Sequence, residues 1–357
     1  MTSDSRNKKS LRKLAGYLLP VVITFLFLYL AFRNIDLNQS FSQIANTSIV
    51  WLVIYIVVFY LSHYFRALRW KVMIKPVKPD ASKLNLFGAL MIGYGVNCVI
   101  PRLGELYRGL FLGKWENVSR TTMLGTVVVE RVIDIASFAI ASLISVYLYS
   151  GNLYSEITWL KPSLMVGFFI ILVLIVFLFL LVKFQKTFTV VILKFTDRVF
   201  PKMSAKFSEI LSTLIEGLSS IKGASSILSI LFYTVLIFVF YALNTYVGFF
   251  MLGMEKMGDV NFTMAWVFMA ISAYGVLIPT PGGTGSYHII SIFVLSELYS
   301  FGVEISAAYA ILSHFIQYVV FILSTVFLVY FINKKRGREG ASKENFFSVF
   351  NSTIGEK

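Results

Sequence analysis

The sequence predicts an all-α integral membrane protein, with about six full transmembrane helices and two broken re-entrant hairpins of opposite orientation. Hydrophobic residues make up 57% of the 357 residues and charged residues only 14%, whereas a soluble domain carries about a quarter charged residues. The mean hydropathy is +0.77. Apolar runs such as 166–182 lack the alternation of a transmembrane β-strand, so the spanning segments are expected to be helices rather than a barrel.

The apolar blocks define a single membrane domain, expected at 16–332, between a basic N-terminus at 1–15 and a polar tail at 333–357. Most blocks reach the roughly 20 residues that cross a bilayer. No small-residue cleavage site follows the first block, so we expect it to remain as a span. The blocks lie at about 16–32, 49–65, 84–100, 122–149, 161–183, 226–252, 262–279, 284–299 and 304–332.

Helix-breaking residues interrupt the apolar pattern twice, which predicts the re-entrant hairpins at about 84–112 and 262–299. Pro101 ends the first arm of the earlier hairpin. Charge does not distinguish a re-entrant later hairpin from two full crossings, so both alternatives stay open. Opposed broken helices are typical of the substrate site of inverted-repeat transporters. The breaking residues of the later hairpin are Pro279, Pro281, Gly282, Gly283 and Gly285.

The net charge of +14 comes from basic residues in short loops between apolar blocks, which favours retention of these loops in the cytoplasm over nucleic-acid binding. A full crossing at 84–100 would place the loop 183–225 and the basic residues Lys334 to Arg336 outside. A re-entrant first hairpin therefore predicts a multi-pass protein of the inner membrane with both termini in the cytoplasm. Residues 204–221 repeat apolar side chains every three or four positions, which predicts an amphipathic helix on the cytoplasmic interface or against a soluble partner.

The first break carries the densest group of polar residues in the apolar region. Pro101 suits the first position of a helix, so a helix is expected to begin there, inside the membrane, with free N–H groups that favour an anion. Each intramembrane charge costs about 2.5–3.5 kcal/mol on insertion scales, which argues for a buried polar cavity. The candidate residues are Asn97, Pro101, Arg102, Gly104, Glu105 and Arg108.

A second charged group, Glu130, Arg131 and Asp134, lies within the apolar block 122–149. Glu130 and Asp134 share a helix face, and Arg131 lies beside them. Arg131 is expected to pair with Glu105, or Glu130 with Arg102 or Arg108. Two interpretations stay open: a structural ion-pair network that fixes the first hairpin, and a network that binds and gates a lipid headgroup.

The glycine-rich break from Pro279 to Gly285 resembles a phosphate-binding loop but lacks the Lys-Ser/Thr ending of a nucleotide site. It is expected to present backbone donors at a half-helix start near Pro281, or simply to allow close helix packing. Ser286 and His288 follow without a hydrolase pattern. The three histidines lack metal-ligand spacing, so no metal or other cofactor is expected.

Arg66, Arg69 and Trp70 follow the second apolar block. Arginine and tryptophan at this position are typical of an anchor in the membrane interface, with contact to lipid headgroups as a secondary role.

These motifs together resemble the lysylphosphatidylglycerol synthase transmembrane-region family of flippase-like, UPF0104-type membrane proteins. The resemblance implies a membrane domain that moves lipids or lipid-linked molecules between leaflets. The soluble aminoacyl-transferase domain of the namesake enzymes has no counterpart after Ile332, so the resemblance does not imply aminoacylation. A carboxylate common in the family after the glycine turn is replaced by Tyr287-His288. The matching stretches are Arg66 to Trp70, Pro101 to Glu105 with Arg108, Glu130 to Asp134, and Pro281 to Gly285.

The sequence therefore favours a lipid flippase or transporter without enzymatic activity that binds an anionic lipid headgroup. In this hypothesis Arg102, Arg108 and Arg131 contact phosphate, while carboxylates hold and gate them. One alternative is an intramembrane transferase for polyprenyl-phosphate-linked substrates, with Glu105 or Asp134 as acid or base. Another is an accessory subunit with a protein partner in envelope biosynthesis.

Overall fold

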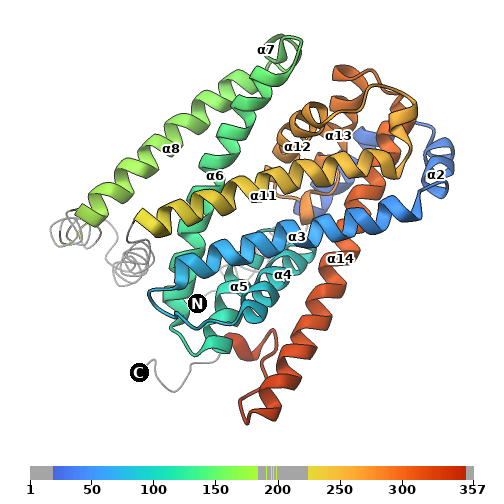
Figure 1. Cartoon of the computed structure of the whole chain (residues 1–357). Helices are drawn as coiled ribbons and strands as arrows, with labels where there is room; N and C mark the ends of the chain where they lie inside the picture. The colour runs from blue at the N-terminus through green and yellow to red at the C-terminus, as the bar shows by residue number, and fades with distance from the viewer. Residues whose placement is uncertain are drawn as a thin grey trace, which may run out of the picture. The chain divides into compact units, whose positions relative to one another are not determined.

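The computed structural model describes residues 19–183 and 224–350, together with residues 190, 194, 196 and 198. The predicted amphipathic helix at 204–221 and the basic N-terminus at 1–15 lie outside these residues. The described part of the chain is helical, without a β-strand (Figure 1). Its main helices are Leu19–Phe32, α2 (Leu37–Ala45), α3 (Ile49–Ile74), α4 (Lys83–Val99), α5 (Gly104–Glu116), α6 (Arg120–Leu148), α7 (Leu153–Glu156), α8 (Leu160–Lys183), α11 (Ala224–Met251), α12 (Phe262–Leu277), α13 (Ser286–Phe293) and α14 (Val303–Arg338).

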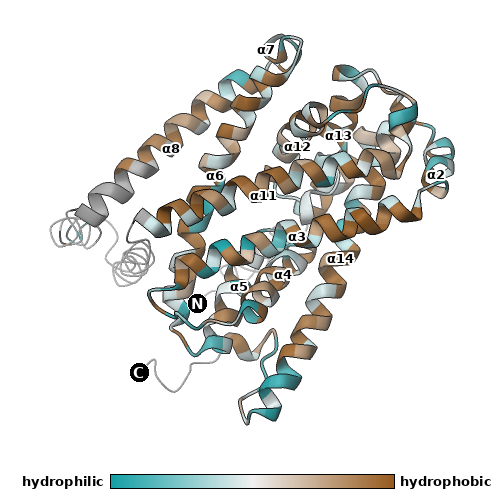
Figure 2. Cartoon of the chain, viewed as in Figure 1, coloured by the Kyte–Doolittle hydropathy of each residue, from teal (hydrophilic) through white to brown (hydrophobic). Residues whose placement is uncertain are grey.

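Three of the described helices are long and apolar enough to cross a membrane: α3, α11 from Ser225 onward, and α14. A fourth candidate is the pair Leu19–Phe32 and α2, which is bent by 88°. Asp36 begins α2 because its carboxylate accepts hydrogen bonds from two backbone amides of the first turn. Figure 2 shows α3 and α11 as mostly hydrophobic, whereas the C-terminal end of α14 is hydrophilic.

The expected six full spans are not found among the described helices. The block at 16–32 ends in the sharp bend before α2, and α12 is only 16 residues long. The helix α6 has 29 residues but carries Glu130, Arg131 and Asp134 at its centre. Length and apolar composition therefore support three or four spans.

The described chain divides into two compact units. Unit 1 contains residues up to Val58, Tyr94–Gly104 and Tyr241–Leu323. Unit 2 contains Phe59–Gly93, Glu105–Phe240 and the residues from Ser324 onward. The first break thus belongs to unit 1, and the charged group on α6 belongs to unit 2.

Both predicted helix breaks are present. The first interrupts the chain between α4 and α5, where Arg102 adopts a left-handed backbone conformation with φ of 63°. Pro101 lies in this turn, so α5 begins at Gly104 rather than at the expected Pro101. The side-chain oxygen of Asn97 accepts a hydrogen bond from the Gly104 amide at 2.8 Å. The Asn97 side chain therefore satisfies a backbone amide at the start of α5.

The second break separates α12 from α13 in unit 1, and the two helices pack against each other. A Cβ atom added at Gly275 would lie 2.7 Å from Cα of Tyr287 and 2.8 Å from the carbonyl oxygen of Ser286. The Ser286 hydroxyl donates to the Gly275 carbonyl at 2.6 Å. Glycine at this position lets the two backbones approach closely, as is common between membrane helices.

The predicted polar tail folds back within unit 2. Phe346 makes edge-to-face contacts with Tyr107 and Phe111 of α5, with ring centroids 5.6 Å and 5.5 Å apart. Asn333 exchanges hydrogen bonds with the backbone of Glu344, and Val349 is fully buried. The tail therefore covers one side of α5.

We predict that Gly275→Ala lowers the free energy of unfolding by about 1–3 kcal/mol, because the added methyl group meets backbone atoms that cannot rotate away. Chemical denaturation of the purified protein in detergent measures this change. Gly167→Ala on α8 is the matched control, since nothing lies within 4 Å of its added Cβ. Equal effects of the two substitutions would contradict the close approach of α12 and α13.

We also predict that Phe346→Ala lowers the free energy of unfolding by about 1–3 kcal/mol, because it removes two aromatic contacts with α5. The neighbouring Phe347 is 86% exposed, so Phe347→Ala is a control of the same chemistry. Thermal unfolding in detergent compares the two variants. If Phe347→Ala proved as damaging as Phe346→Ala, the docking of the tail onto α5 would be wrong.

Candidate functional site

The charged residues of unit 2 gather where α3, α5 and α6 meet. Arg66 and Arg69 lie one turn apart on α3, and Glu130 and Asp134 lie one turn apart on α6, so each pair shares a helix face. Arg108 of α5 joins them from a third helix. We call this group, together with Glu105 and Arg131, the ion cluster.

Glu130 is the centre of the ion cluster and is fully buried. Its Oε1 atom accepts hydrogen bonds from Arg66 Nε at 2.9 Å and from Arg69 Nη2 at 3.2 Å. Its Oε2 atom lies 2.9 Å from Nη1 of Arg108. One carboxylate thus faces three guanidinium groups, which offsets the cost of burying its charge.

Asp134 continues the network one turn further along α6. Its two oxygens accept hydrogen bonds from Arg66 and Arg69, respectively. Arg69, which is fully buried, also donates to the hydroxyl of Thr234 on α11 at 3.1 Å. The two arginines of α3 are therefore tied to both carboxylates of α6.

The outer edge of the ion cluster is held more loosely. Arg131 lies 3.7 Å from Glu105 and 3.7 Å from Asp134, longer than the contacts around Glu130. The side chains of Arg131, Glu105 and Asp134 are 36%, 30% and 19% exposed, respectively. The ion cluster contains four guanidinium groups and three carboxylates, which leaves one excess positive charge. Arg131 is the most accessible of the four guanidinium groups.

The structure gives Arg66, Arg69 and Trp70 a different place from the predicted interface anchor. All three are buried, and the Trp70 indole donates to the hydroxyl of Thr126 at 3.0 Å. The guanidinium carbon of Arg108 lies 5.1 Å from the Trp70 ring centroid, a cation–π contact. Their position at the end of an apolar block indicated an interface anchor. Instead, the two arginines pair in the interior with carboxylates more than 60 positions later in the chain.

The pairings left open by the sequence can now be assigned. Arg131 approaches Glu105, and Arg108 approaches Glu130. Arg102 instead donates a hydrogen bond of 3.1 Å to the carbonyl of Leu277, the last residue of α12. The two broken hairpins therefore meet within unit 1, where Arg102 joins the tip of one to the break of the other.

Three backbone amides of the glycine-rich break are hydrogen-bonded to nearby residues of the same segment. Pro281 begins a single 3₁₀ turn, Pro281–Gly283, and the helix proper starts at Ser286, so the expected helix start at Pro281 is wrong. The amides of Gly283 and Thr284 donate to Thr280 and Pro281, respectively. The amide of Gly285 donates to Nδ1 of His288 at 3.3 Å. These three amides, expected to serve an anion, are already engaged by the chain.

Close packing accounts for Gly285. Its φ is 87°, and an added Cβ would lie 2.7 Å from Cβ of Phe27 and 2.9 Å from the carbonyl oxygen of Thr24. The break thus rests directly on the backbone of the helix Leu19–Phe32. Pro279 lies in the same short connection, between the end of α12 and the 3₁₀ turn. Within the described residues no group of three or more potential metal ligands comes together.

These features define a polytopic α-helical integral membrane protein with an ion cluster buried among its helices. The chain belongs to the lysylphosphatidylglycerol synthase TM region family, whose sequence profile matches residues 17–324. A UPF0104 membrane protein of Methanocaldococcus jannaschii is 25% identical over 335 residues, covering 89% of this chain and 96% of that protein. A UPF0104 membrane protein of Methanothermobacter thermautotrophicus is 26% identical over 245 residues, covering 64% and 70%, respectively. No solved structure matches the chain.

We predict that Glu130→Gln lowers the free energy of unfolding by about 3–5 kcal/mol, because it leaves three buried guanidinium groups without their central charge. Denaturation in detergent, followed by circular dichroism, measures the loss. Asp80→Asn is the control: Asp80 pairs with Lys78 at 3.0 Å, and its side chain is 75% exposed. A Glu130→Gln protein as stable as the wild type would show that the cluster does not depend on this carboxylate.

Proposed function

We propose that this protein is a lipid flippase or transporter that binds an anionic lipid headgroup at the ion cluster and moves the lipid between leaflets. The observation that carries the proposal is the uneven arrangement of charge in unit 2. The inner arginines Arg66, Arg69 and Arg108 lie within 3.2 Å of Glu130. Arg131 is partly exposed, and its contacts with Glu105 and Asp134 among the described residues are 3.7 Å long. A phosphate group is the natural partner for such a guanidinium.

The inner network would act as the support of this site. Arg66, Arg69 and Glu130 connect α3 to α6 through short, buried contacts. Such contacts fix the direction in which Arg131 leaves α6. An arriving phosphate competes with Glu105 for Arg131, so headgroup binding would release the contact between Glu105 of α5 and Arg131 of α6, while Arg108 of α5 would stay beside Glu130. This exchange of partners is the proposed gate.

Family membership supports the proposal, because the family description names a synthase of a phospholipid, lysylphosphatidylglycerol. The meeting of the two broken hairpins at Arg102 and Leu277 also supports it, since transporters place interrupted helices at their substrate path. We further propose an inner-membrane location with both termini in the cytoplasm, on the basis of the positive-inside rule. In this proposal the protein is not an enzyme.

We predict that Arg131→Gln slows transbilayer movement of a fluorescent phosphatidylglycerol in proteoliposomes by about tenfold or more, because a charge-assisted hydrogen bond to phosphate is lost. Arg131→Lys should retain part of the rate, since it keeps the charge but not the forked donor geometry. Dithionite quenching of the outer-leaflet label gives the rate.

Lys78→Gln removes a cation from a loop outside the ion cluster and is the control. Its rate should equal that of the wild type. Empty liposomes set the background. Wild-type rates at this background, or an Arg131→Gln rate equal to that of the wild type, would refute the proposal.

One observation favours a second function, an intramembrane transferase for polyprenyl-phosphate-linked substrates. The carboxylate of Glu105 is 30% exposed and lies 3.7 Å from Arg131, so a substrate at the outer edge of the ion cluster could reach it as a general base. Incubation of the reconstituted protein with a lipid-linked sugar, followed by mass spectrometry, separates the two functions. A covalent change that is abolished by Glu105→Gln favours the transferase.

A further inference from the structure

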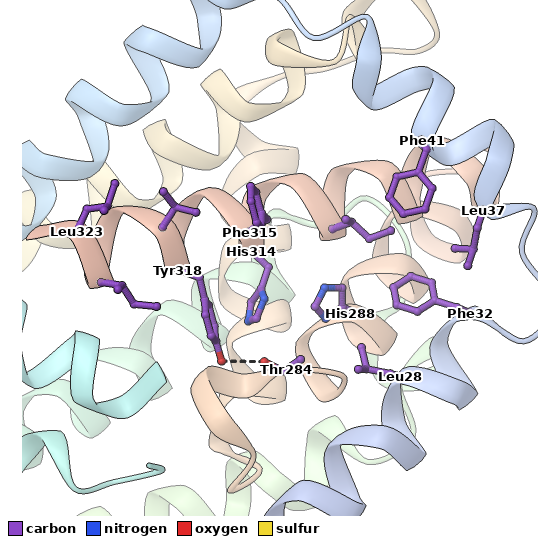
Figure 3. Close-up of a pocket in the computed structure, with 13 residues that line it drawn as sticks. Leu28, Phe32, Leu37, Phe41, Thr284, His288, His314, Phe315, Tyr318 and Leu323 are labelled. Atoms are coloured by element: carbon purple, nitrogen blue, oxygen red, sulfur yellow. Dashed lines mark hydrogen bonds between the residues drawn. The ribbon is translucent and has the colours of Figure 1, made fainter. Parts of the chain in front are cut away.

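A cavity of about 660 Å³ lies in unit 1, and no residue of the ion cluster lines it. Its walls come from the helix Leu19–Phe32, from α2, from the glycine-rich break, from α13 and from α14 (Figure 3). The α14 wall is a single stripe that repeats every three or four residues, as expected for one helix face. The lining residues on α14 are Ile311, His314, Phe315, Tyr318, Val319, Ile322 and Leu323.

Most of the cavity wall is hydrocarbon. Nine of the thirteen lining side chains are aliphatic or phenyl groups, including Phe32, Phe41 and Phe315. Phe315 and Leu323 are 63% and 62% exposed, so the cavity opens on the side of the helices that faces lipid chains in a membrane. This wall suits a hydrocarbon chain, because its apolar side chains can pack against methylene groups without burying an unsatisfied polar group.

The polar groups are gathered at one place, beside the glycine-rich break. Tyr318 and Thr284 lie 2.8 Å apart through their hydroxyl oxygens (Figure 3), and both donate to the carbonyl of Pro281. These hydroxyl groups are therefore satisfied by the backbone. The imidazoles of His288 and His314 are the remaining polar groups, and they are only 5% and 8% exposed.

Backbone partners assign the protons of the two imidazoles. The Gly285 amide can only donate, so Nδ1 of His288 accepts and the neutral ring carries its proton on Nε2. The Gly282 carbonyl can only accept, so Nε2 of His314 donates to it at 3.1 Å. Nδ1 of uncharged His314 is then an acceptor. A charge on this ring would be costly in an apolar wall.

The cavity therefore presents one donor and one acceptor that no hydrogen bond among the described residues uses. The donor is Nε2–H of His288 and the acceptor is Nδ1 of His314. Their ring centroids lie 4.7 Å apart, close enough for one small group to meet both. A hydroxyl group accepts one hydrogen bond and donates another, so it matches both nitrogens. A phosphate without a proton offers only acceptors and would meet the lone pair of His314.

We propose that this cavity binds an uncharged lipid with a free hydroxyl group, such as a diacylglycerol, with one hydrocarbon chain along the stripe of α14. The hydroxyl group accepts from His288 and donates to His314. This site differs from the proposed anionic site in both place and chemistry.

The test uses the full-length protein in nanodiscs and a diacylglycerol with a photoreactive diazirine in one acyl chain. We expect cross-linking to peptides from the cavity wall, displaced by unlabelled diacylglycerol. The methyl ether of the same lipid, which cannot donate, should compete about tenfold more weakly. Phosphatidic acid with the same chains should also compete more weakly than diacylglycerol.

Variants separate recognition from folding. His314→Phe keeps a flat ring but removes the acceptor, so diacylglycerol and its methyl ether should compete to within about twofold of each other. Val319→Trp fills the cavity and should abolish labelling of the wall. His63→Phe changes a buried histidine outside the cavity and should leave the preference intact, as should Arg131→Gln in the ion cluster.

Three results would overturn the proposal: equal competition by diacylglycerol and its methyl ether in the wild type, stronger competition by phosphatidic acid, or unchanged labelling in Val319→Trp. A failure here leaves the lipid-transport rate and its dependence on Arg131 untouched, so the two proposals fail separately.

Discussion

The burial of Glu130 among three arginines is the interaction on which unit 2 depends. A charged group removed from water is tolerated only with opposite charges held close by. Here those charges come from α3 and α5, while the carboxylate comes from α6. Because guanidinium and carboxylate groups pair in few geometries, the cluster fixes how these three helices rotate and slide against one another. The position of the accessible Arg131 on α6 follows from this arrangement.

Unit 1 achieves close helix contact by a different route. Gly275 brings α12 against α13, and Gly285 brings the second break against the helix Leu19–Phe32. Apolar helices in lipid gain little hydrophobic free energy from association. Their association therefore depends more on close packing, which glycine allows because it has no side chain. The left-handed backbone conformations at the break also let the chain turn just before α13 begins at Ser286. The cavity with its two imidazoles lies beside this compact turn.

Much of this arrangement could be predicted from local sequence. Proline and glycine clusters indicate where helices break, and intramembrane charge at Glu105, Arg108 and Glu130 indicates a paired group. The start of α5 could not be placed correctly, because the strained conformation of Arg102 displaces it three residues beyond Pro101. Arg66 and Arg69 were assigned to the interface because their partners lie far along the chain. The bend after Phe32 and the two-imidazole cavity likewise depend on contacts between distant segments.

The docking of the tail has a consequence for how the protein is made. Phe346 covers the aromatic side of α5, the helix that carries Arg108 into the ion cluster. Domains fold progressively from the N-terminus during synthesis, so α5 enters the bilayer long before its cover exists. Its final packing must wait until Phe346 has been synthesised. In biogenesis the segment around Phe346 therefore completes the packing of a helix that is synthesised much earlier.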